Sequence, residues 1–534
     1  MRISAAASEA HGSSTTSKTS PKRDLAVALS LVNVAFLRVW SEILTYGRPD
    51  TYLMKTPPPP AAYYAAITDV LIGAVVLWGA VTAARRYLAP SWFRWVRMAF
   101  LVSLAVPLNA IRSVLSVDFK YLRSPLFEVV GTRGVLLIAI VLGAVVVWLI
   151  VLHYRPASHI AAGVVAFFLP LVALTFGQAV WKAVHYDDSE FRVRLAPLIP
   201  TARELPRVLW IICDEWDYSL TFEDRDPSLS LPQIDRLRGE TLFASNAHPP
   251  GPETPISIPG YVTGRLVDDV SYRGPYHLEI RYRDADRPWF SLAREPNVFG
   301  RVRALGLNTA VVGWFHPYCG LFQNDLVSCE WWEMAMQHNS MGRTFRAALA
   351  GEAESLFETT LLSPFGQSLA LKEHIATYRS VVAAAQAIVN NRQFQFTYVH
   401  LPVPHAPFGY SRKTGRFDLS NSPVKGYIDS LALLDRTLGE LRQSMESART
   451  WDDTSVLITT DHPFREAELI HGKFDPRIPF FFKLAGQHQG LSYEAPFNTV
   501  LIQDLLLAVL RQEVTDAPGA ARWLDANRSH TPLD

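Results

Sequence analysis

Cysteine is scarce in this chain of 534 residues, which contains only three. Three thiols are too few for a disulfide scaffold or for a zinc site built from cysteine. An excess of charge of one sign is also lacking, because 51 lysine and arginine residues balance 50 aspartate and glutamate residues. The chain therefore has no net field to recruit nucleic acid, and we expect no nucleic-acid partner. Charged residues make up only 19% and hydrophobic residues 49%, which excludes a disordered or fibrous chain and indicates membrane segments.

Long runs without charge lie in the first part of the chain. Each is close to the roughly 20 residues that cross about 30 Å of hydrocarbon. We predict five membrane spans, at about 25–46, 65–84, 98–116, 134–153 and 159–181. The first contains Arg38 and Glu42, four residues apart on one helical face. These two either pair inside the bundle or take part in moving a substrate.

The loops between these spans carry more lysine and arginine on one side than on the other. This bias favours an N-terminus inside the cell, with residues 1–24 as a cytoplasmic tail before a transmembrane bundle at 25–181. No small-residue cleavage site follows the Ser/Thr-rich start, so we interpret the first span as an anchor and not a removed signal. An odd number of spans then places everything after about residue 182 outside the cytoplasm. We expect a multi-pass protein of the cell (inner) membrane with an extracytoplasmic domain.

After a Pro-containing linker at 182–206, the pattern changes to strands that alternate with helices. Short apolar runs predict strands at 208–213, 307–315, 394–401 and 454–460, and helices are expected at 231–240, 343–360, 367–390 and 425–447. This alternation predicts an α/β domain at 207–490, with a mostly parallel sheet and helices on both faces. The remainder, 491–534, is expected to hold a closing helix at 497–513 and a loose tail.

Acidic residues follow two of the predicted strands. Asp214 and Glu215 follow the first strand, and Asp461 and His462 follow the last. Catalytic groups in open α/β sheets gather at the carboxyl ends of strands, where these side chains would form a ligand set for a divalent metal. Each motif alone is more typical of an ordinary strand-end cap than of a metal site. A third segment, FASNAHPPGPETPISIPGYVTGR at 243–265, offers hydroxyl groups at the start of a helix. A metal beside such a hydroxyl can activate it as a nucleophile, and the helix dipole favours a bound anion there.

Taken together, these segments resemble the alkaline phosphatase and sulfatase superfamily. Thr254 stands eleven residues before Arg265, the end of a Thr-Gly-Arg motif, as in the family's nucleophile segment. Further segments resemble, in order, the first metal-ligand strand, the lead-in to the nucleophile, the substrate-side histidine segment and the last metal segment with its His-Gly: VLWIICDEW at 208–216, LPQIDRLRGETLFASNA at 231–247, HLPVPHAPF at 400–408, LITTDHPFRE at 457–466 and IHGK at 470–473. The resemblance implies an alkaline phosphatase-like fold.

Membrane spans followed by an extracytoplasmic catalytic domain are also the layout of lipoteichoic acid synthases and phosphoethanolamine transferases, which use a threonine nucleophile. Classical sulfatases instead oxidise a Cys or Ser to formylglycine within a Cys-x-Pro-x-Arg pattern. The corresponding residues here are Thr254-Pro-Ile-Ser-Ile, without that Cys or Arg. The resemblance therefore implies phospho-chemistry in place of formylglycine chemistry.

The resemblance also assigns roles to single residues. Thr254 would be the nucleophile, with Ser257 as the fallback, and His405 would bind phosphate oxygens or protonate the leaving group. The implied metal ligands are Asp214, Thr254, Asp461 and His462, and the implied substrate-binding residues are His471, His400, Lys473 and Arg265. His400 packing in a strand and Lys473 as a solvated loop residue are the alternatives. The metal would be Zn or Mn, with Ca or Mg as other options, and Asp435 is a candidate ligand for a second ion.

Cys319 and Cys329 lie ten residues apart in the domain that we place outside the cytoplasm. An oxidising compartment favours a disulfide between them, and free buried thiols are the alternative. The same stretch carries His316 and several aromatic residues, which either line the mouth of a substrate site or pack in the core.

The expected function is therefore a membrane-anchored, metal-dependent transferase. A threonyl intermediate would take a phospho-alcohol group from a membrane phospholipid donor and pass it to an envelope glycan or lipid acceptor. One alternative is a hydrolase of phosphoric or sulfuric esters with the same fold. Another is a non-catalytic membrane protein that binds an envelope polymer.

Overall fold

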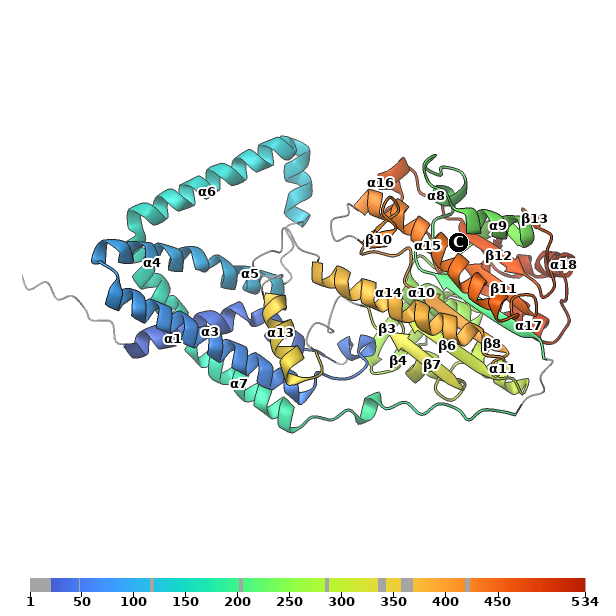
Figure 1. The fold of residues 1–534 in the computed structure, drawn as a ribbon, viewed down its shortest axis with the longest axis horizontal. Helices are drawn as coiled ribbons and strands as arrows, with labels where there is room; N and C mark the ends of the chain where they lie inside the picture. The colour runs from blue at the N-terminus through green and yellow to red at the C-terminus, as the bar shows by residue number, and fades with distance from the viewer. Residues whose placement is uncertain are drawn as a thin grey trace, which may run out of the picture. The chain divides into compact units, whose positions relative to one another are not determined.

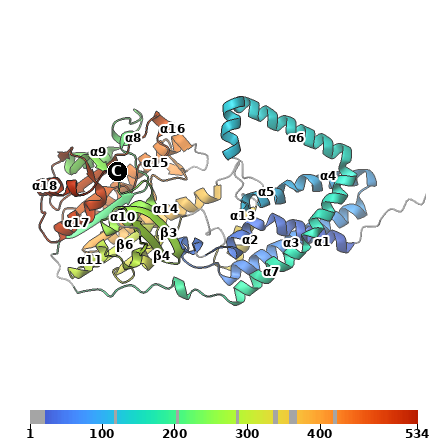
Figure 2. The same cartoon turned by 180° about the vertical axis from the view of Figure 1, so that it is seen from behind.

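The computed structural model describes residues 21–47, 49–115, 120–200, 205–283, 288–334, 342–356, 368–417 and 423–533. The chain divides into two compact units, one helical and one α/β (Figures 1 and 2). This division does not follow the order of the sequence. Thr45–Pro59 belongs to the α/β unit, whereas helix α13 (Phe345–Leu356) belongs to the helical unit.

The helical unit contains most of the chain up to Val184. Its further helices are α1 (Pro21–Ala35), α2 (Leu37–Leu44), α3 (Pro60–Tyr87), α4 (Pro90–Ser103), α5 (Ala105–Val114), α6 (Lys120–Phe167) and α7 (Leu169–Val184). α1, α3 and α7 pack on one another, and α13 packs on α3. The buried amide oxygen of Asn33 accepts hydrogen bonds from Trp40 Nε1 and Thr175 Oγ1, each at 3.0 Å, so one polar group joins α1, α2 and α7.

Within the part of the chain that the structure describes, three helical segments are long and apolar enough to cross a membrane, or four if α1 and α2 form one bent span. The first is α3, Pro60–Tyr87. The second, Ser91–Arg112, joins most of α4 and α5, and the third, Val151–Val184, joins the end of α6 to α7. They lie at the sites of three predicted spans. The first predicted span is broken, because α1 and α2 meet at an angle of 59°. Arg38 pairs with Glu42 in α2, at 2.8 Å. The predicted span at 134–153 falls within α6, where several side chains lie outside the described residues, so five spans remains a prediction.

A nine-stranded sheet forms the centre of the α/β unit. Its strand order is β13-β2-β12-β11-β1-β8-β6-β7, and β14 also pairs with β2. The strands are β1 (Arg207–Cys213), β2 (Leu242–His248), β6 (Thr309–Trp314), β7 (Ser328–Trp332), β8 (Phe396–Leu401), β11 (Thr454–Thr459), β12 (Ile478–Lys483), β13 (Leu491–Tyr493) and β14 (Phe497–Asn498). Only β12 runs antiparallel to its neighbours among these described strands. The predicted mostly parallel sheet is therefore confirmed.

Alternate residues of β1 pack into two separate hydrophobic cores. Val208, Trp210 and Ile212 belong to one core, and Leu209, Ile211 and Cys213 to the other. This period of two places one core on each face of the sheet. α10 (Thr254–Thr263), α11 (Val298–Ala304) and α17 (Ile502–Leu510) cover the first face, and α9 (Pro232–Glu240), α14 (Ser368–Val389) and α15 (Pro423–Ser447) cover the second. α14 and α15 lie in front of the sheet in Figure 1.

The α/β unit also contains two small sheets and several short helices. β3 (Val267–Gly274), β4 (His277–Tyr282) and β5 (Phe290–Ser291) form a separate three-stranded sheet, and β9 (Tyr410–Ser411) pairs with β10 (Arg416–Phe417). The short helices are α8 (Tyr218–Phe222), α12 (Tyr318–Leu321) and α16 (Glu468–His471).

The expectation of a loose tail is wrong, because α18 (Ala517–Asn527) follows α17. Asp516 caps α18 by accepting from the Gly519 N–H at 2.7 Å, and Leu524 is fully buried.

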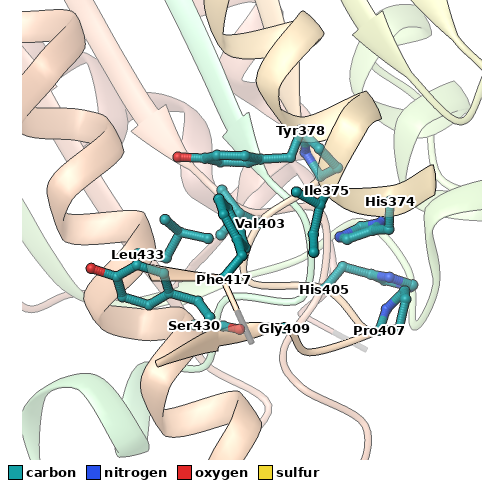
Figure 3. A pocket seen from close by; sticks show the side chains of 12 residues that line it. His374, Ile375, Tyr378, Val403, His405, Pro407, Gly409, Phe417, Ser430 and Leu433 are labelled. Carbon is teal, nitrogen blue, oxygen red and sulfur yellow. The ribbon is translucent and has the colours of Figure 1, made fainter. Parts of the chain in front are cut away.

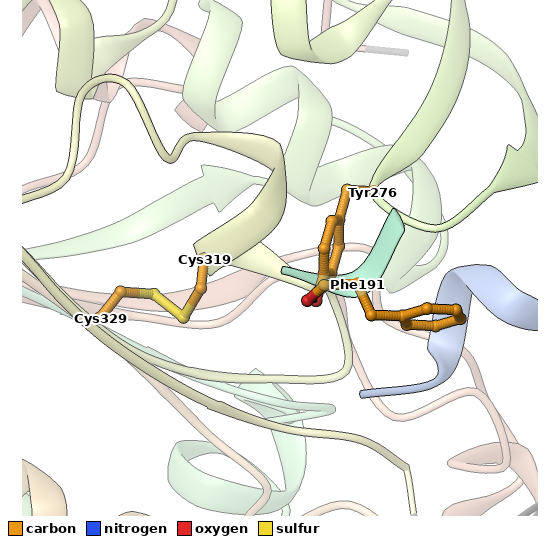
Figure 4. The surroundings of a disulfide bond; sticks show 4 residues. All are labelled: Phe191, Tyr276, Cys319 and Cys329. Carbon is orange, nitrogen blue, oxygen red and sulfur yellow. A yellow bond between two sulfur atoms is a disulfide. The ribbon is translucent and has the colours of Figure 1, made fainter. Parts of the chain in front are cut away.

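Cys319 in α12 and Cys329 in β7 form a disulfide, with Cα atoms 5.5 Å apart (Figure 4). The predicted disulfide is therefore present, and the alternative of free thiols at these two positions is wrong. Beside it in Figure 4, the Tyr276 hydroxyl donates to the Phe191 carbonyl at 2.8 Å and holds the linker against the unit. The disulfide closes a loop of ten residues and fixes α12 to an edge strand.

We expect the double variant Cys319→Ser, Cys329→Ser to destabilise the α/β unit by about 2–3 kcal/mol, because a short loop is no longer closed in the unfolded chain. Thermal unfolding followed by tryptophan fluorescence measures this as a lower Tm. Reductant should lower the Tm of the wild type toward that of the variant and leave the variant unchanged. Equal Tm values for all three samples would show that the disulfide contributes nothing.

Candidate active site

Three neighbouring strands bring the predicted ligands to one edge of the sheet. β1 lies between β11 and β8, all three are parallel, and Ile212 pairs with Thr459 on one side and His400 on the other. Asp214 and Asp461 each follow two residues after the paired positions of β1 and β11. Their side chains therefore lie together at the buried carboxyl end of the sheet, and both are fully buried.

Thr254 lies against this pair. Its Oγ1 is 2.6 Å from Asp461 Oδ2, 3.3 Å from Asp214 Oδ2 and 3.3 Å from His462 Nε2. All four predicted metal ligands thus lie around one point, although they are separated by up to 248 positions of sequence from Asp214 to His462.

The local sequence explains why Thr254 begins a helix. Pro255 occupies the first turn of α10, where a missing N–H has no cost, and the N–H groups of Ile256 and Ser257 both donate to the Glu253 carbonyl. Gly264 ends the helix in the left-handed region at φ 71°, where a Cβ would lie 1.8 Å from Gln503 Nε2. The glycine of the Thr-Gly-Arg motif is therefore a helix cap, and Thr254 sits at the positive end of the helix dipole.

Arg265, predicted to bind substrate, follows this cap at the far end of α10. A helix of ten residues is about 15 Å long, so the structure does not bring Arg265 to Thr254. Its guanidinium group lies over the ring of Tyr282 at 3.7 Å. The spacing of eleven residues between Thr254 and Arg265 thus reflects the length of α10 and its glycine cap. The Arg265 side chain packs against the three-stranded sheet through Tyr282.

His400 lies inside the group of ligands. Its Nε2 is 3.4 Å from Asp214 Oδ2, and its Nδ1 is 2.9 Å from the Tyr318 hydroxyl. One ligand atom each from Asp214, His400 and Asp461 lie within 4.8 Å of one another. His400, assigned to substrate by resemblance, is therefore placed where a metal ligand would be, and its ring is fully buried.

The chemistry of this group fits a divalent cation. Asp214 Oδ1 and His400 Nε2 are buried and have no hydrogen-bond partner among the residues that the structure describes. His462 Nδ1 donates to the Pro463 carbonyl at 2.9 Å, which leaves the Nε2 lone pair directed at Thr254. Two carboxylates and two imidazoles are a donor set suited to Zn or Mn. The residues that would hold the ion are Asp214, Thr254, His400, Asp461 and His462.

Glu215 has a strained backbone next to this group. Its φ of 61° lies in the left-handed region, which non-glycine residues rarely adopt. This conformation directs its N–H to Asp461 Oδ1 at 3.3 Å, while its carboxylate accepts from Arg465 Nε at 2.9 Å. Arg465, four residues after Asp461, is a cation beside the site that the sequence analysis missed. Its guanidinium group is half exposed, so it remains open to an anionic substrate.

His405 lies at a small, mostly apolar pocket, shown in Figure 3. Its Nδ1 donates to the Ala406 carbonyl, which leaves Nε2 available 3.9 Å from Glu215 Oε2. His374 from α14 lines the same pocket. Burial, with a smaller contribution from the charge of His405, lowers the pKa of His374 to about 3, so it is neutral at physiological pH. His374 lacks any motif in the sequence that points to the site.

Burial tends to raise the pKa of Asp214, but the charges of His405, His400 and His462 outweigh it and hold that pKa below its usual range. Asp214 is therefore a carboxylate, the form that binds a cation.

Other predicted residues lie elsewhere. Ser257 Oγ donates to the Gly251 carbonyl at 2.8 Å, as a structural residue would. Asp435, the candidate for a second metal, accepts from the N–H groups of Gln233 and Ile234 and caps α9. Lys473 forms a surface ion pair with Asp224 at 2.7 Å. His471 ends α16, and its side chain lies outside the described residues.

His316 lies beneath the nucleophile and not at a mouth. It is 1% exposed, and its Nε2 is 3.3 Å from the Thr254 carbonyl oxygen. Burial lowers the pKa of His316 to about 3. Its position two residues after the end of β6 follows the same strand-end pattern as Asp214, which is the signal that could have assigned it to the site.

Comparison with solved structures finds proteins that resemble part of this chain. A phosphonate monoester hydrolase of Agrobacterium radiobacter is 14% identical, with a TM-score of 0.38 over 57% of this chain and 74% of that chain. A sulfatase from Pseudoalteromonas sp. is 14% identical, with a TM-score of 0.39 over 59% and 73%. A protein in the alkaline phosphatase superfamily from Vibrio parahaemolyticus is 14% identical, with a TM-score of 0.37 over 61% and 71%.

A search of curated proteins finds no match to this chain. The family model described as Sulfatase, in contrast, matches residues 206–490, which include every strand and side chain of the group around Thr254. Because this match covers just over half of the chain, the protein belongs to the sulfatase family of the alkaline phosphatase superfamily, which is a family of enzymes.

Proposed function

We propose that this protein is a membrane-anchored, metal-dependent transferase. It takes a phospho-alcohol group from a phospholipid and passes it to an envelope glycan or lipid through a covalent intermediate on Thr254. The observation that carries this proposal is the contact of 2.6 Å between Thr254 Oγ1 and Asp461, within a buried cation-binding group at a helix N-terminus. The apolar helices and the resemblance in layout to lipoteichoic acid synthases and phosphoethanolamine transferases support a lipid donor.

The identity of the nucleophile argues against formylglycine chemistry. Oxidation of a Cys or Ser side chain gives an aldehyde because the Cβ carries two hydrogens. The Cβ of Thr254 carries a methyl group, so it cannot become an aldehyde. Ser257, the nearest serine in the helix, uses its hydroxyl in a bond to Gly251. Thr254 therefore acts as an alcohol, which favours a phosphoester intermediate over a sulfate route.

In the first half of the reaction, Thr254 Oγ1 attacks the phosphorus atom while its proton passes to the adjacent Asp461 carboxylate. The bond between phosphorus and the diacylglycerol oxygen breaks, and His405 Nε2 protonates that oxygen. Arg465 and the N-terminus of α10 hold the phosphate oxygens. A bound metal ion would lower the pKa of the hydroxyl and polarise the phosphoryl group.

In the second half, an acceptor hydroxyl attacks phosphothreonine and gives its proton to His405. The bond between phosphorus and Thr254 Oγ1 breaks, and the proton on Asp461 returns to that oxygen. Water in place of the acceptor would make the protein a hydrolase, and the match to the sulfatase model favours this as the second candidate. The loop-charge bias supports an extracytoplasmic catalytic unit, where both envelope acceptors and outer-leaflet donors are present.

The test is incubation of the purified full chain with phospholipid whose headgroup is labelled, with and without a polymeric envelope acceptor. We expect diacylglycerol to form and the label to move to the acceptor, because the acceptor hydroxyl attacks the phosphothreonine intermediate in place of water. Label released as a free phospho-alcohol at the same rate without acceptor would identify a hydrolase. Cleavage of p-nitrophenyl sulfate without any phosphoester cleavage would reject phospho-chemistry.

Thr254→Ala should lower kcat by at least about 1,000-fold, because the covalent route cannot begin without the hydroxyl. Thr254→Ser should keep partial activity, since it loses only a methyl group. Ser257→Ala is the matched control and should be mild. Intact mass should show a phospho-alcohol adduct on the wild type and not on Thr254→Ala. If Ser257→Ala abolishes turnover and Thr254→Ala does not, the nucleophile is misassigned.

Metal binding can be measured without turnover. Mn²⁺ or Zn²⁺ at about 100 times Kd should stabilise the wild type by about 2.7 kcal/mol and raise its Tm. Asp461→Asn should remove this response, because it replaces a charged ligand. Asp435→Asn makes the same change at the cap of α9, so the metal should still raise its Tm. A metal response that survives in Asp461→Asn would place the ion elsewhere.

A further inference from the structure

The loop between α2 and α3 places several of its side chains in the interior of the α/β unit. Both flanking helices belong to the helical unit, yet Thr45–Pro59 belongs to the other. A short turn of 3₁₀-helix at Asp50–Leu53 packs on β3, and Tyr52 joins the hydrophobic core that covers the first face of the sheet. Tyr52 is 0% exposed and Met54 is 1% exposed, whereas connecting loops normally run over the surface.

Tyr52 reaches the nucleophile through one residue. Its hydroxyl is 2.7 Å from His316 Nδ1, and His316 Nε2 is 3.3 Å from the Thr254 carbonyl oxygen. A carbonyl oxygen can only accept, so Nε2 carries the hydrogen. Nδ1 of the neutral ring is then an acceptor, and the Tyr52 hydroxyl donates to it. Tyr52 thereby fixes the tautomer of His316 that can hold Thr254.

We propose that Tyr52 is a positioning residue for the nucleophile, so that the loop between two apolar helices completes the active site of the α/β unit. The inference rests on the proposed function for the role of Thr254. The Thr254 carbonyl belongs to the first residue of α10 and is bonded to the Cα that carries the side chain, so a displacement of this backbone also moves Oγ1 relative to Asp461 and His462. Misplacement of a reacting atom by 1 Å can cost about 100-fold in rate.

The hydroxyl of Tyr52 can be tested apart from its ring. The ring stacks on Tyr272 at 4.7 Å between centroids, and phenylalanine would keep that stack. The loop is also held by Lys55, whose N–H donates to Glu333 at 3.1 Å and whose ammonium group lies 5.1 Å from the Trp332 ring centroid. Tyr52→Phe therefore leaves the loop in place and removes only the donor to His316. Tyr272→Phe removes a hydroxyl from the neighbouring ring and is the matched control.

The experiment uses the purified full chain, with bis(p-nitrophenyl) phosphate as substrate and Mn²⁺ as metal. For Tyr52→Phe we expect kcat at saturating Mn²⁺ to fall by about 10-fold or more and Mn²⁺ affinity to fall several-fold. Partners in the outer shell of a metal site typically contribute about 10- to 100-fold. KM and Tm should stay near the wild-type values, because substrate contacts and packing are unchanged. Tyr272→Phe should match the wild type in all four quantities.

Each outcome decides the inference. If Tyr52→Phe matches Tyr272→Phe in kcat and in Mn²⁺ affinity, the inference is overturned while the proposed function stands. A loss of kcat that comes with a matching fall in Tm and a rise in KM would make Tyr52 a packing residue and also overturn it. If the wild type cleaves no ester, the proposed function fails, and Mn²⁺ affinity alone then decides whether Tyr52 positions Thr254.

Discussion

Two carboxylates buried side by side are the constraint on which the rest of the site depends. Asp214 and Asp461 follow adjacent parallel strands and are fully buried, in a place where their mutual repulsion is poorly screened. Such a pair persists only if positive charge or a cation compensates it. His400, His462 and His405 supply imidazoles around Asp214, and the orphaned Asp214 Oδ1 and His400 Nε2 mark where a cation would bind.

The surrounding structure meets this constraint with backbone geometry as well as with side chains. Glu215 adopts a left-handed conformation that turns its N–H toward Asp461, and Trp216 N–H donates to Thr460 Oγ1 at 3.0 Å in the adjacent loop. α10 adds the positive end of its dipole, with Thr254 as its first residue. The buried charge therefore explains the strained residue, the placement of the helix and the density of histidines at one edge of the sheet.

The central strands and the ligands after them were predictable because their signals are local. The apolar runs that became β1, β8 and β11 are short and continuous, and the carboxylates follow directly. Local signals failed where packing decides the outcome. Arg265 belongs to the same motif as Thr254, but helix length separates them, and His400 lies among the carboxylates because β8 pairs with β1. α18 was missed although Asp516 caps its first turn, and that turn contains both proline and glycine, which are poor helix formers.

Contacts between residues that are far apart in the sequence are harder to predict from the sequence alone. Tyr52 and His316 are 264 positions apart, and no spacing or motif connects a loop between two apolar helices with a strand end of the α/β unit. α13 presents the same difficulty in reverse, since its sequence lies among the catalytic elements although it packs on α3.

Thr45–Pro59 belongs to the α/β unit and α13 belongs to the helical unit, so neither unit is made from one continuous piece of chain. The core beneath Thr254 includes Tyr52, which is synthesised before most of the apolar helices, and the helical unit includes α13, which is synthesised after β7. Each unit therefore completes its packing only when it binds a segment whose neighbours in the sequence belong to the other unit. Long loops must close before these contacts form, so their entropic cost precedes the gain from burial. An arrangement of this kind couples a fully packed catalytic core to a correctly folded set of apolar helices.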